Sequence, residues 1–256
     1  MISMIKRKAL LLEIQDDGFI IAAGSNNELL AYEHFGHSIK DGMLVDQSAF
    51  LSSVKNFRQQ HKVKGRTIRL VLKSKHLIFR FVSFPTMKSN ELAFAAKSKM
   101  GDLFPIDIKQ YVIDYKATET PDGIEVMYAG VPAAMLEGYT AALKDAKQKT
   151  IVVDVFQNCI VRCLPQEDYC LLLNLSQNIS LTIVEKGRIQ TIQELPFNSE
   201  TTMELNRFLG IRKQGSKVIY MEEKLFSLEE YFKERGFSIQ WVDPSPLALK
   251  GLILRR

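Results

Sequence analysis

The chain carries one pattern of strands twice. LLLEIQDDGFIIAAG begins at Leu10 and LLLNLSQNISLTIVEKG begins at Leu171, and each consists of an apolar strand, a short polar turn and a second apolar strand. A third apolar stretch follows each copy, ELLAYEHF from Glu28 and RIQTIQELPF from Arg188. Short apolar runs bounded by turn residues predict buried strands joined as hairpins. A repeated three-strand meander therefore predicts a duplicated fold with two lobes, each built on its own sheet.

The composition is that of a globular protein with enough length for two cores. Of 256 residues, 46% are hydrophobic and 25% are charged, and no apolar run approaches the roughly 18 residues of a membrane-spanning helix. The N-terminal segment has Glu13, Asp16 and Asp17 where a signal peptide would have its cleavage region, so we expect a cytoplasmic protein. The net charge of +5 is spread along the chain without a block of like charge, which is typical of a mixed solvated surface and predicts no nucleic-acid partner.

The cysteines and histidines do not form a metal motif. Cys159, Cys163 and Cys170 are odd in number and have no histidine beside them, so we expect reduced core thiols. His34 and His37 lack further ligands nearby. The sequence therefore predicts no metal site.

No known catalytic motif is present. The chain lacks G-x-S-x-G, H-E-x-x-H and a Walker P-loop, and Ser176 lies in a turn with no histidine placed to activate it. Adjacent acids such as Asp16 with Asp17 and Glu222 with Glu223 are expected to be solvated at turns. We therefore predict that the protein is not an enzyme.

Strands and helices alternate in a definite order, which predicts an α/β fold. The first meander and a helix over residues 45–61 are followed by a βαββα unit over about 76–150. A strand and a short helix lead to the second meander, and further helices and strands alternate to the end. We predict a first lobe over residues 1–165, including the inserted unit, and a reduced second lobe over 166–256.

Several segments carry a family resemblance. They are LIFRFVSFP followed by a helix with Asn90, Glu91 and Leu92; FPIDIKQYVIDY with Pro105 and Asp114; VMYAGVPAAMLEGYTAALKDA; and the strand with Val153 and Asp154. Together these resemble the PilM family of type IV pilus assembly proteins, which are actin-like and related to FtsA and to the cytoplasmic domain of GspL. The resemblance covers most of the chain and implies a two-lobed actin-like (ribonuclease H-like) fold with a small subdomain inserted in the first lobe.

The family holds a nucleotide's phosphates between the turns of its two meanders. Its first turn reads Asp-Ile-Gly-Ser-Ser, whose glycine permits close backbone approach to phosphate. This chain has Glu13, Ile14, Gln15, Asp16 and Asp17 there. The glycine is replaced, and each carboxylate about 4 Å from a phosphate charge would repel it by about 4 kcal/mol at the effective dielectric of a protein surface.

The other two loops depart from the family in the same direction. The second turn has Asn174, Ser176 and Gln177 in place of an acid, a glycine and small hydroxyl residues. Glu222 and Glu223 stand where the family has a Gly-Gly turn under the base. With all three loops changed, the sequence predicts a pseudo-ATPase without a cofactor.

The resemblance implies a scaffold in a type IV pilus assembly machine, peripheral to the inner membrane. In the family, a groove beside the inserted unit accepts the cytoplasmic tail of the inner-membrane protein PilN, and a pilus motor ATPase and a second copy of the chain are further candidate partners. The candidate anchors for such a tail are Phe79, Phe81, Phe84, Pro85 and Phe104, although the aromatic residues also suit a core.

Three alternatives remain open at this level. A GspL-like cytoplasmic domain of a type II secretion system would have the same ancestry and a reduced second lobe. A genuine ATP-binding actin-like protein could have diverged loops. An FtsA-like protein would end in an amphipathic membrane helix, for which PLALKGLILRR is short, and this ending also suits a last core helix.

Overall fold

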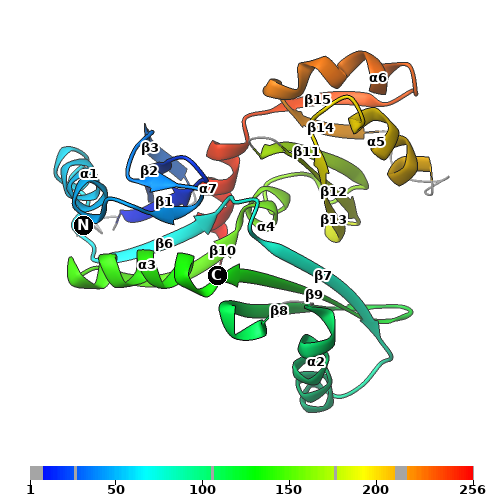
Figure 1. The fold of residues 1–256 in the computed structure, drawn as a ribbon, viewed down its shortest axis with the longest axis horizontal. Coiled ribbons are helices and arrows are strands. Elements are labelled where there is room, and N and C mark those ends of the chain that lie inside the picture. Colours follow the sequence, from blue (N-terminus) through cyan, green and yellow to red (C-terminus); the bar gives the residue numbers. More distant parts are fainter. Residues whose placement is uncertain (1–7, 26–27, 105–106, 176–177, 211–217, 256) are drawn as a thin grey trace, which may run out of the picture. The chain divides into compact units, whose positions relative to one another are not determined.

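The computed structural model describes residues 8–25, 28–104, 107–175, 178–210 and 218–255 (Figure 1). The chain forms two compact units, one combining Met1–Lys75 with Ala142–Arg256 and the other consisting of His76–Ala141. The second unit lies within the span in which the sequence predicts an insertion. Among the described residues, no helix is both long and apolar enough to cross a bilayer.

The larger unit contains two five-stranded sheets of the same topology. The first has the order β10-β6-β1-β2-β3 and the second the order β13-β12-β11-β14-β15. In each, an antiparallel meander is extended by two strands parallel to its first strand. The strands of the first sheet are β1 (Ala9–Ile14), β2 (Phe19–Ser25), β3 (Glu28–Phe35), β6 (Thr67–Leu72) and β10 (Lys149–Val155). Those of the second are β11 (Tyr169–Leu175), β12 (Asn178–Glu185), β13 (Arg188–Pro196), β14 (Val218–Glu222) and β15 (Ser238–Val242). The predicted duplication is confirmed.

Helices and short elements connect these strands. They are β4 (Ile39–Lys40), β5 (Met43–Leu44), α1 (Gln47–Gln60), α3 (Ala133–Asp145), α4 (Phe156–Val161), α5 (Thr201–Gly210), η2 (Glu223–Leu228), α6 (Glu229–Lys233) and α7 (Pro244–Leu254). Asp46 is the N-cap of helix α1, and its side chain accepts a hydrogen bond from the Ala49 backbone N–H at 2.9 Å. Phe50, Val54 and Phe57 of α1 are buried at helical spacing.

One hydrophobic core joins the two sheets. It contains side chains of β1 and β11 together with α4 and α7, including Leu11, Phe156, Leu171 and Leu249. Figure 1 shows α4 and α7 between the sheets. The C-terminal segment is thus a core helix, as one sequence alternative predicted, and not a free membrane helix. Gly251 permits the contact of α7 with α4, because a Cβ at this position would lie 1.8 Å from a backbone oxygen.

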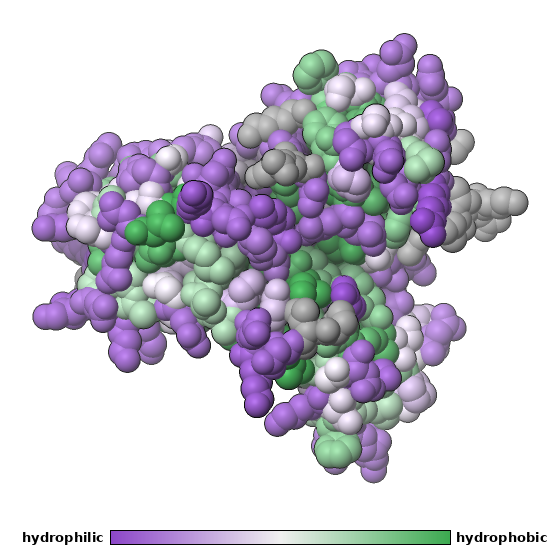
Figure 2. Space-filling view, in the orientation of Figure 1, coloured by the Kyte–Doolittle hydropathy of each residue, from purple (hydrophilic) through white to green (hydrophobic). Residues whose placement is uncertain are grey.

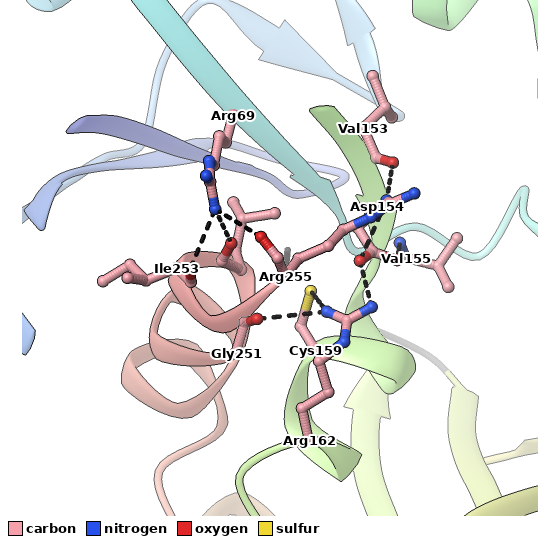
Figure 3. Close-up of polar contacts among 10 residues, drawn as sticks. Arg69, Val153, Asp154, Val155, Cys159, Arg162, Gly251, Ile253 and Arg255 are labelled. Carbon is pink, nitrogen blue, oxygen red and sulfur yellow. Dashed lines mark hydrogen bonds and ion pairs between the residues drawn. The ribbon is translucent and has the colours of Figure 1, made fainter. Parts of the chain in front are cut away.

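Polar contacts fix the C-terminal end of α7 (Figure 3). Arg69 of β6 donates hydrogen bonds of 2.9 to 3.0 Å to the carbonyls of Leu252, Ile253 and Arg255, which a helix end leaves without partners. The buried carboxylate of Asp154 pairs with Arg162 at 2.5 Å and with Arg255 at 3.2 Å. These contacts connect β6, β10, α4 and α7.

The inserted unit is a three-stranded antiparallel sheet with one helix. The strand order is β7-β9-β8, and the elements are β7 (Ile78–Phe84), α2 (Ser89–Leu103), η1 (Ile108–Gln110), β8 (Tyr111–Thr120) and β9 (Gly123–Pro132). Helix α2 covers one face of the sheet, where Ala96, Phe104 and Tyr128 form the centre of a small core. The Tyr128 hydroxyl donates a hydrogen bond to the Ala96 carbonyl at 3.1 Å.

Candidate functional site

The turn after β1 is held by the chain itself. The Gln15 N–H donates to the Gly18 carbonyl at 2.9 Å and closes the turn. Asp16 is buried, and its carboxylate accepts hydrogen bonds from the Ser74 hydroxyl at 2.5 Å and the Lys75 N–H at 3.2 Å, just after β6. Asp17 is exposed. The prediction that both acids are solvated is therefore wrong for Asp16, because Ser74 and Lys75 take the place of water around its carboxylate.

Glu13, the last acid before this turn, is fully buried. One carboxylate oxygen accepts hydrogen bonds from the Gln15 amide at 2.7 Å and from the Ser245 hydroxyl of α7 at 3.0 Å. The other, Oε2, has no hydrogen-bond partner in the described part of the chain. Burial raises the pKa of the Glu13 carboxyl, while the nearby Lys73 ammonium acts in the opposite direction and Glu222 adds to the increase.

The second lobe contributes Glu222, the last residue of β14, which is buried. Its carboxylate accepts a hydrogen bond from the Asn174 N–H at 2.9 Å and lies 3.7 Å from the Lys73 ammonium. Lys73 follows β6 in the first lobe, and its ammonium lies 4.8 Å from the ring centroid of Phe156. Glu223 is exposed. The prediction that Glu222 and Glu223 are both solvated is therefore wrong for Glu222, whose carboxylate is buried against Asn174 and Lys73.

These contacts join the carboxyl ends of the two sheets. Lys73 and Glu222 form an ion pair across the lobes, and Glu13 is linked to α7. The sequence predicts Asn174 and Glu222 at this site, but no local pattern predicts Lys73 or Ser245 there. The signal for Glu13 was present, because it is a charged residue in an otherwise apolar strand. Ser176 and Gln177, which the sequence also places here, lie outside the described residues.

The predicted partner-binding aromatics separate onto two faces of the inserted sheet. Phe84 and Phe104 belong to the core under α2, where Arg80 donates to the Leu103 carbonyl at 3.1 Å and its guanidinium lies 5.9 Å from the Phe104 ring centroid. Because side chains alternate along a strand, Phe79 and Phe81 lie on the face opposite α2.

On the face opposite α2, β7 and β9 contribute apolar side chains, whereas β8 contributes Asp114 and Lys116. Phe79 pairs with Ala129 and Phe81 with Met127 in the β7–β9 register. Phe79 and Met127 are buried, whereas Phe81 is half-buried. Pro85, which follows β7, is exposed. Of the five predicted anchors, only Phe79 and Phe81 share this face.

The cysteines and histidines contact other protein groups and do not cluster into a metal site in the described ranges. All three cysteines are free, and burial raises the pKa of the Cys159 thiol well above its ordinary value. The His37 ring lies 3.3 Å from the Ser53 hydroxyl, within hydrogen-bond distance. Within the described ranges, no group of three or more histidine, cysteine or acidic side chains could hold a metal ion.

Comparison with known proteins defines the fold. No protein-family model matches the chain, and no curated protein matches it in sequence. Among solved structures, a PilM–PilN type IV pilus biogenesis complex matches with a TM-score of 0.76 and 19% identity over 93% of this chain and 89% of that chain. A Bacteroides thetaiotaomicron protein of unknown function with an actin-like ATPase fold matches with a TM-score of 0.61 and 10% identity, over 98% and 97%.

The cytoplasmic domain of EpsL, an inner-membrane component of the type II secretion system of Vibrio cholerae, also matches. Its TM-score is 0.60 and its identity is 11%, over 96% of this chain and 93% of that chain. These identities are low, so the likeness concerns the fold. The chain therefore has the two-lobed actin-like fold that its resemblance to PilM implied.

Proposed function

We propose that this chain is a cytoplasmic actin-like scaffold of a type IV pilus assembly machine. It would bind the cytoplasmic tail of a PilN-like inner-membrane protein, and would work without nucleotide. The likeness to the PilM–PilN complex supports the first part, since that match extends over 93% of the chain. The surroundings of Glu13, Lys73 and Glu222 support the second part.

The observation that carries the proposal is the ion pair between Lys73 and Glu222. In the family that the sequence resembles, the nucleotide's phosphates lie between the turns of the two lobes. Here the Lys73 ammonium is already paired with Glu222, and Glu13 is a second buried acid near it. A phosphate entering this region would have to displace a carboxylate from the lysine and remain close to both acids.

Titration calorimetry with Mg-ATP tests the proposed loss of nucleotide binding. We expect no saturable heat at nucleotide concentrations up to about 100 μM. A dissociation constant tighter than this would overturn the pseudo-ATPase proposal and favour an ATP-binding protein with diverged loops. An actin-like ATPase measured in the same buffer serves as the positive control.

The tail site is proposed to lie on the sheet face that carries Phe79 and Phe81. A fluorescent peptide with the cytoplasmic tail of the PilN-type protein from the same organism is the probe. Phe81→Ala is expected to weaken peptide binding by about 1–3 kcal/mol while the fold remains intact, because Phe81 is only half-buried. Phe84→Ala is the matched control in the same strand, since Phe84 packs under α2. Equal affinity of the Phe81 variant and the wild type would exclude this face.

A GspL-like role is the second candidate, favoured by the likeness to the EpsL cytoplasmic domain. The two roles differ in the membrane protein that is bound. Precipitation of the chain from membranes, followed by identification of the inner-membrane protein bound to it, separates a pilus component from a type II secretion component.

A further inference from the structure

The net positive charge of the chain is concentrated in two short segments. Residues 55–66 contain five basic residues and no acid, and residues 144–149 contain three basic residues and one acid, Asp145. Their formal charge is +7, from eight bases less one acid, whereas the whole chain has +5 and the remainder therefore −2. We call these eight side chains the basic edge: Lys55, Arg58, Lys62, Lys64, Arg66, Lys144, Lys147 and Lys149.

The fold brings these two segments together. The parallel pairing of β10 with β6 starts at Lys149 opposite Thr67, and the Lys149 N–H donates to the Arg66 carbonyl at 2.8 Å. The Arg58 guanidinium donates to the Gln148 side chain. The sequence-based prediction of a charge spread along the chain overlooked the basic run at 55–66, and the second segment is almost 80 residues away. The structure corrects this: the ends of α1 and α3 and the starts of β6 and β10 form one basic surface.

Among the described residues, the basic edge has few acids near it, namely Asp145 in its second segment and Glu33, which pairs with His61 at 2.9 Å. All its members except Arg58 are exposed, and within the described ranges none forms an ion pair with an acid. Burial and then the neighbouring Arg66 guanidinium lower the pKa of the Arg58 guanidinium, as expected where like charges lie close together. Figure 2 shows hydrophilic side chains around α1, at the left of the view. An anionic partner would relieve this repulsion.

The chemistry of the basic edge favours a lipid surface over nucleic acid. Six of its eight side chains are lysines, which act as point charges. The Arg58 guanidinium donates to the carbonyls of Val63 and Gly65, so it is not free for bidentate readout of a base or phosphate. None of the described aromatic residues in the two segments is exposed, so bases would have no stacking platform.

Apolar groups accompany the charges. A cavity of about 480 Å³ within the basic edge is lined by Lys55 and Arg58 and also by Leu51, Val54 and Val63. Lys8, which precedes β1, donates to the His61 carbonyl at 2.9 Å and so attaches the start of β1 to this edge.

We propose that the basic edge is a membrane-contact face that binds the anionic headgroups of the lipid bilayer directly. Clusters of four to eight lysines and arginines are typical of such faces, and their attraction decreases within a Debye length of the surface. This inference goes beyond the proposed function, because it requires no partner tail. It gives the scaffold a second attachment to the membrane and orients the amino ends of β6 and β10 towards the lipid.

Liposome flotation with the full chain tests this face. The probes are vesicles of phosphatidylcholine alone and vesicles with about 30% phosphatidylglycerol, in roughly 50 mM and 300 mM salt. The wild type is expected to float at least tenfold more with the anionic vesicles, and the higher salt is expected to abolish most of this binding. Equal flotation with neutral vesicles, or no flotation at either salt concentration, would overturn the proposal.

A charge-reversal variant assigns the binding to the basic edge. Lys62→Glu/Lys64→Glu/Lys147→Glu changes three exposed side chains and is expected to weaken partition into anionic vesicles about 100-fold. Circular dichroism verifies the fold of the variant. Its affinity for the tail peptide should remain that of the wild type, so a failure of the tail proposal is distinguishable from a failure of this one.

The matched control is Lys40→Glu/Lys186→Glu/Lys250→Glu. Both triple variants have a formal charge of −1, which is +5 less two for each substitution. Lys40 lies in β4, near the turn at the carboxyl end of β1, whereas the basic edge lies at the amino end of that strand. Lys186 and Lys250 are also exposed, and neither lies in the two segments of the basic edge. Equal loss in the control would assign the binding to net charge and overturn the proposal. The proposal would also be overturned if the chain bound a DNA duplex through the basic edge and did not bind vesicles.

Discussion

Removal of the Lys73 ammonium should destabilise the protein strongly. The Lys73→Ala variant leaves the Glu222 carboxylate, whose side chain is only 8% exposed, without a cation. Breaking a buried pair costs about 3–5 kcal/mol, and the 3.7 Å separation places this pair at the weak end of that range. The lost contact with the Phe156 ring adds up to about 1 kcal/mol. We expect a loss of about 3–4 kcal/mol in the free energy of unfolding, measured by urea titration with circular dichroism.

Lys75 provides the matched control two residues away. Its ammonium lies 2.7 Å from the Asp41 carboxylate, a shorter distance than in the Lys73 pair, but both side chains are exposed to solvent. Exposed pairs contribute little, so Lys75→Ala should leave the urea midpoint unchanged. If burial rather than distance determines the cost, only the Lys73 variant will lose stability. An equal loss in both variants would refute this reasoning.

A double variant separates the ion pair from the rest of the site. Lys73→Met with Glu222→Gln removes both charges but keeps similar side-chain volumes, and the new amide oxygen still accepts from the Asn174 N–H. Neutral replacements of buried pairs are often close to neutral in stability. We therefore expect the double variant to be more stable than either single variant. A double variant as unstable as the sum of the single variants would show that the two charges do not interact.

Three further predictions concern the same unit. Burial raises the pKa of the Glu13 carboxyl above its ordinary 4.5, so the folded state binds the carboxyl proton more tightly than the unfolded chain does. The contribution of this proton to stability is fully present below pH 4.5, and it is lost as the pH rises through the folded-state pKa. The stability of Glu13→Gln relative to the wild type should therefore increase between pH 4 and pH 8 in urea titrations, and a pH-independent difference would contradict this. Gly251→Ala should lower the free energy of unfolding by about 3 kcal/mol, because the new Cβ would lie 1.8 Å from a backbone oxygen of α4. Gly138→Ala is the control, since no atom lies within 4 Å of its Cβ position, and it should stabilise α3 by up to about 1 kcal/mol. Thermal unfolding measures both variants. Asp154→Ala leaves two arginines without their shared buried carboxylate and should cost about 3 kcal/mol, whereas Asp102→Ala, which removes an exposed pair, should be close to neutral in the same assay.

The sheets could be predicted from sequence because their signal is local. The segments LLLEI and LLLNL are continuous apolar runs, as expected for strands covered on both faces, and each is followed by a turn and a second apolar run. The alternation of side chains along a strand also separates Phe79 and Phe81 from Phe84, because Phe84 is an odd number of positions from both. The shared aromatic type of these residues therefore predicts a common site only where their spacing along the strand is even.

The candidate site depended on contacts that no local pattern specifies. Lys73 is an ordinary lysine after a strand, and only the packing of the two lobes places it beside Glu222, 149 positions further along. The basic edge has the same origin. Its two segments become neighbours through the parallel pairing of β6 with β10, and parallel strands are always joined by a long connection. Charge counted along the sequence therefore underestimates charge concentrated in space.

The ion pair and the shared core bear on how such a scaffold can work. A protein that closes around a nucleotide needs two lobes whose contact energy changes when the ligand binds. Here a single core already includes side chains of both sheets, and Lys73 and Glu222 add a buried ion pair between them. Opening the lobes would expose apolar side chains and leave two charges without their partner, so the equilibrium favours one closed arrangement. Regulation of this chain should therefore act through its surfaces, the sheet face with Phe79 and Phe81 and the basic edge, rather than through closure of the lobes on a ligand.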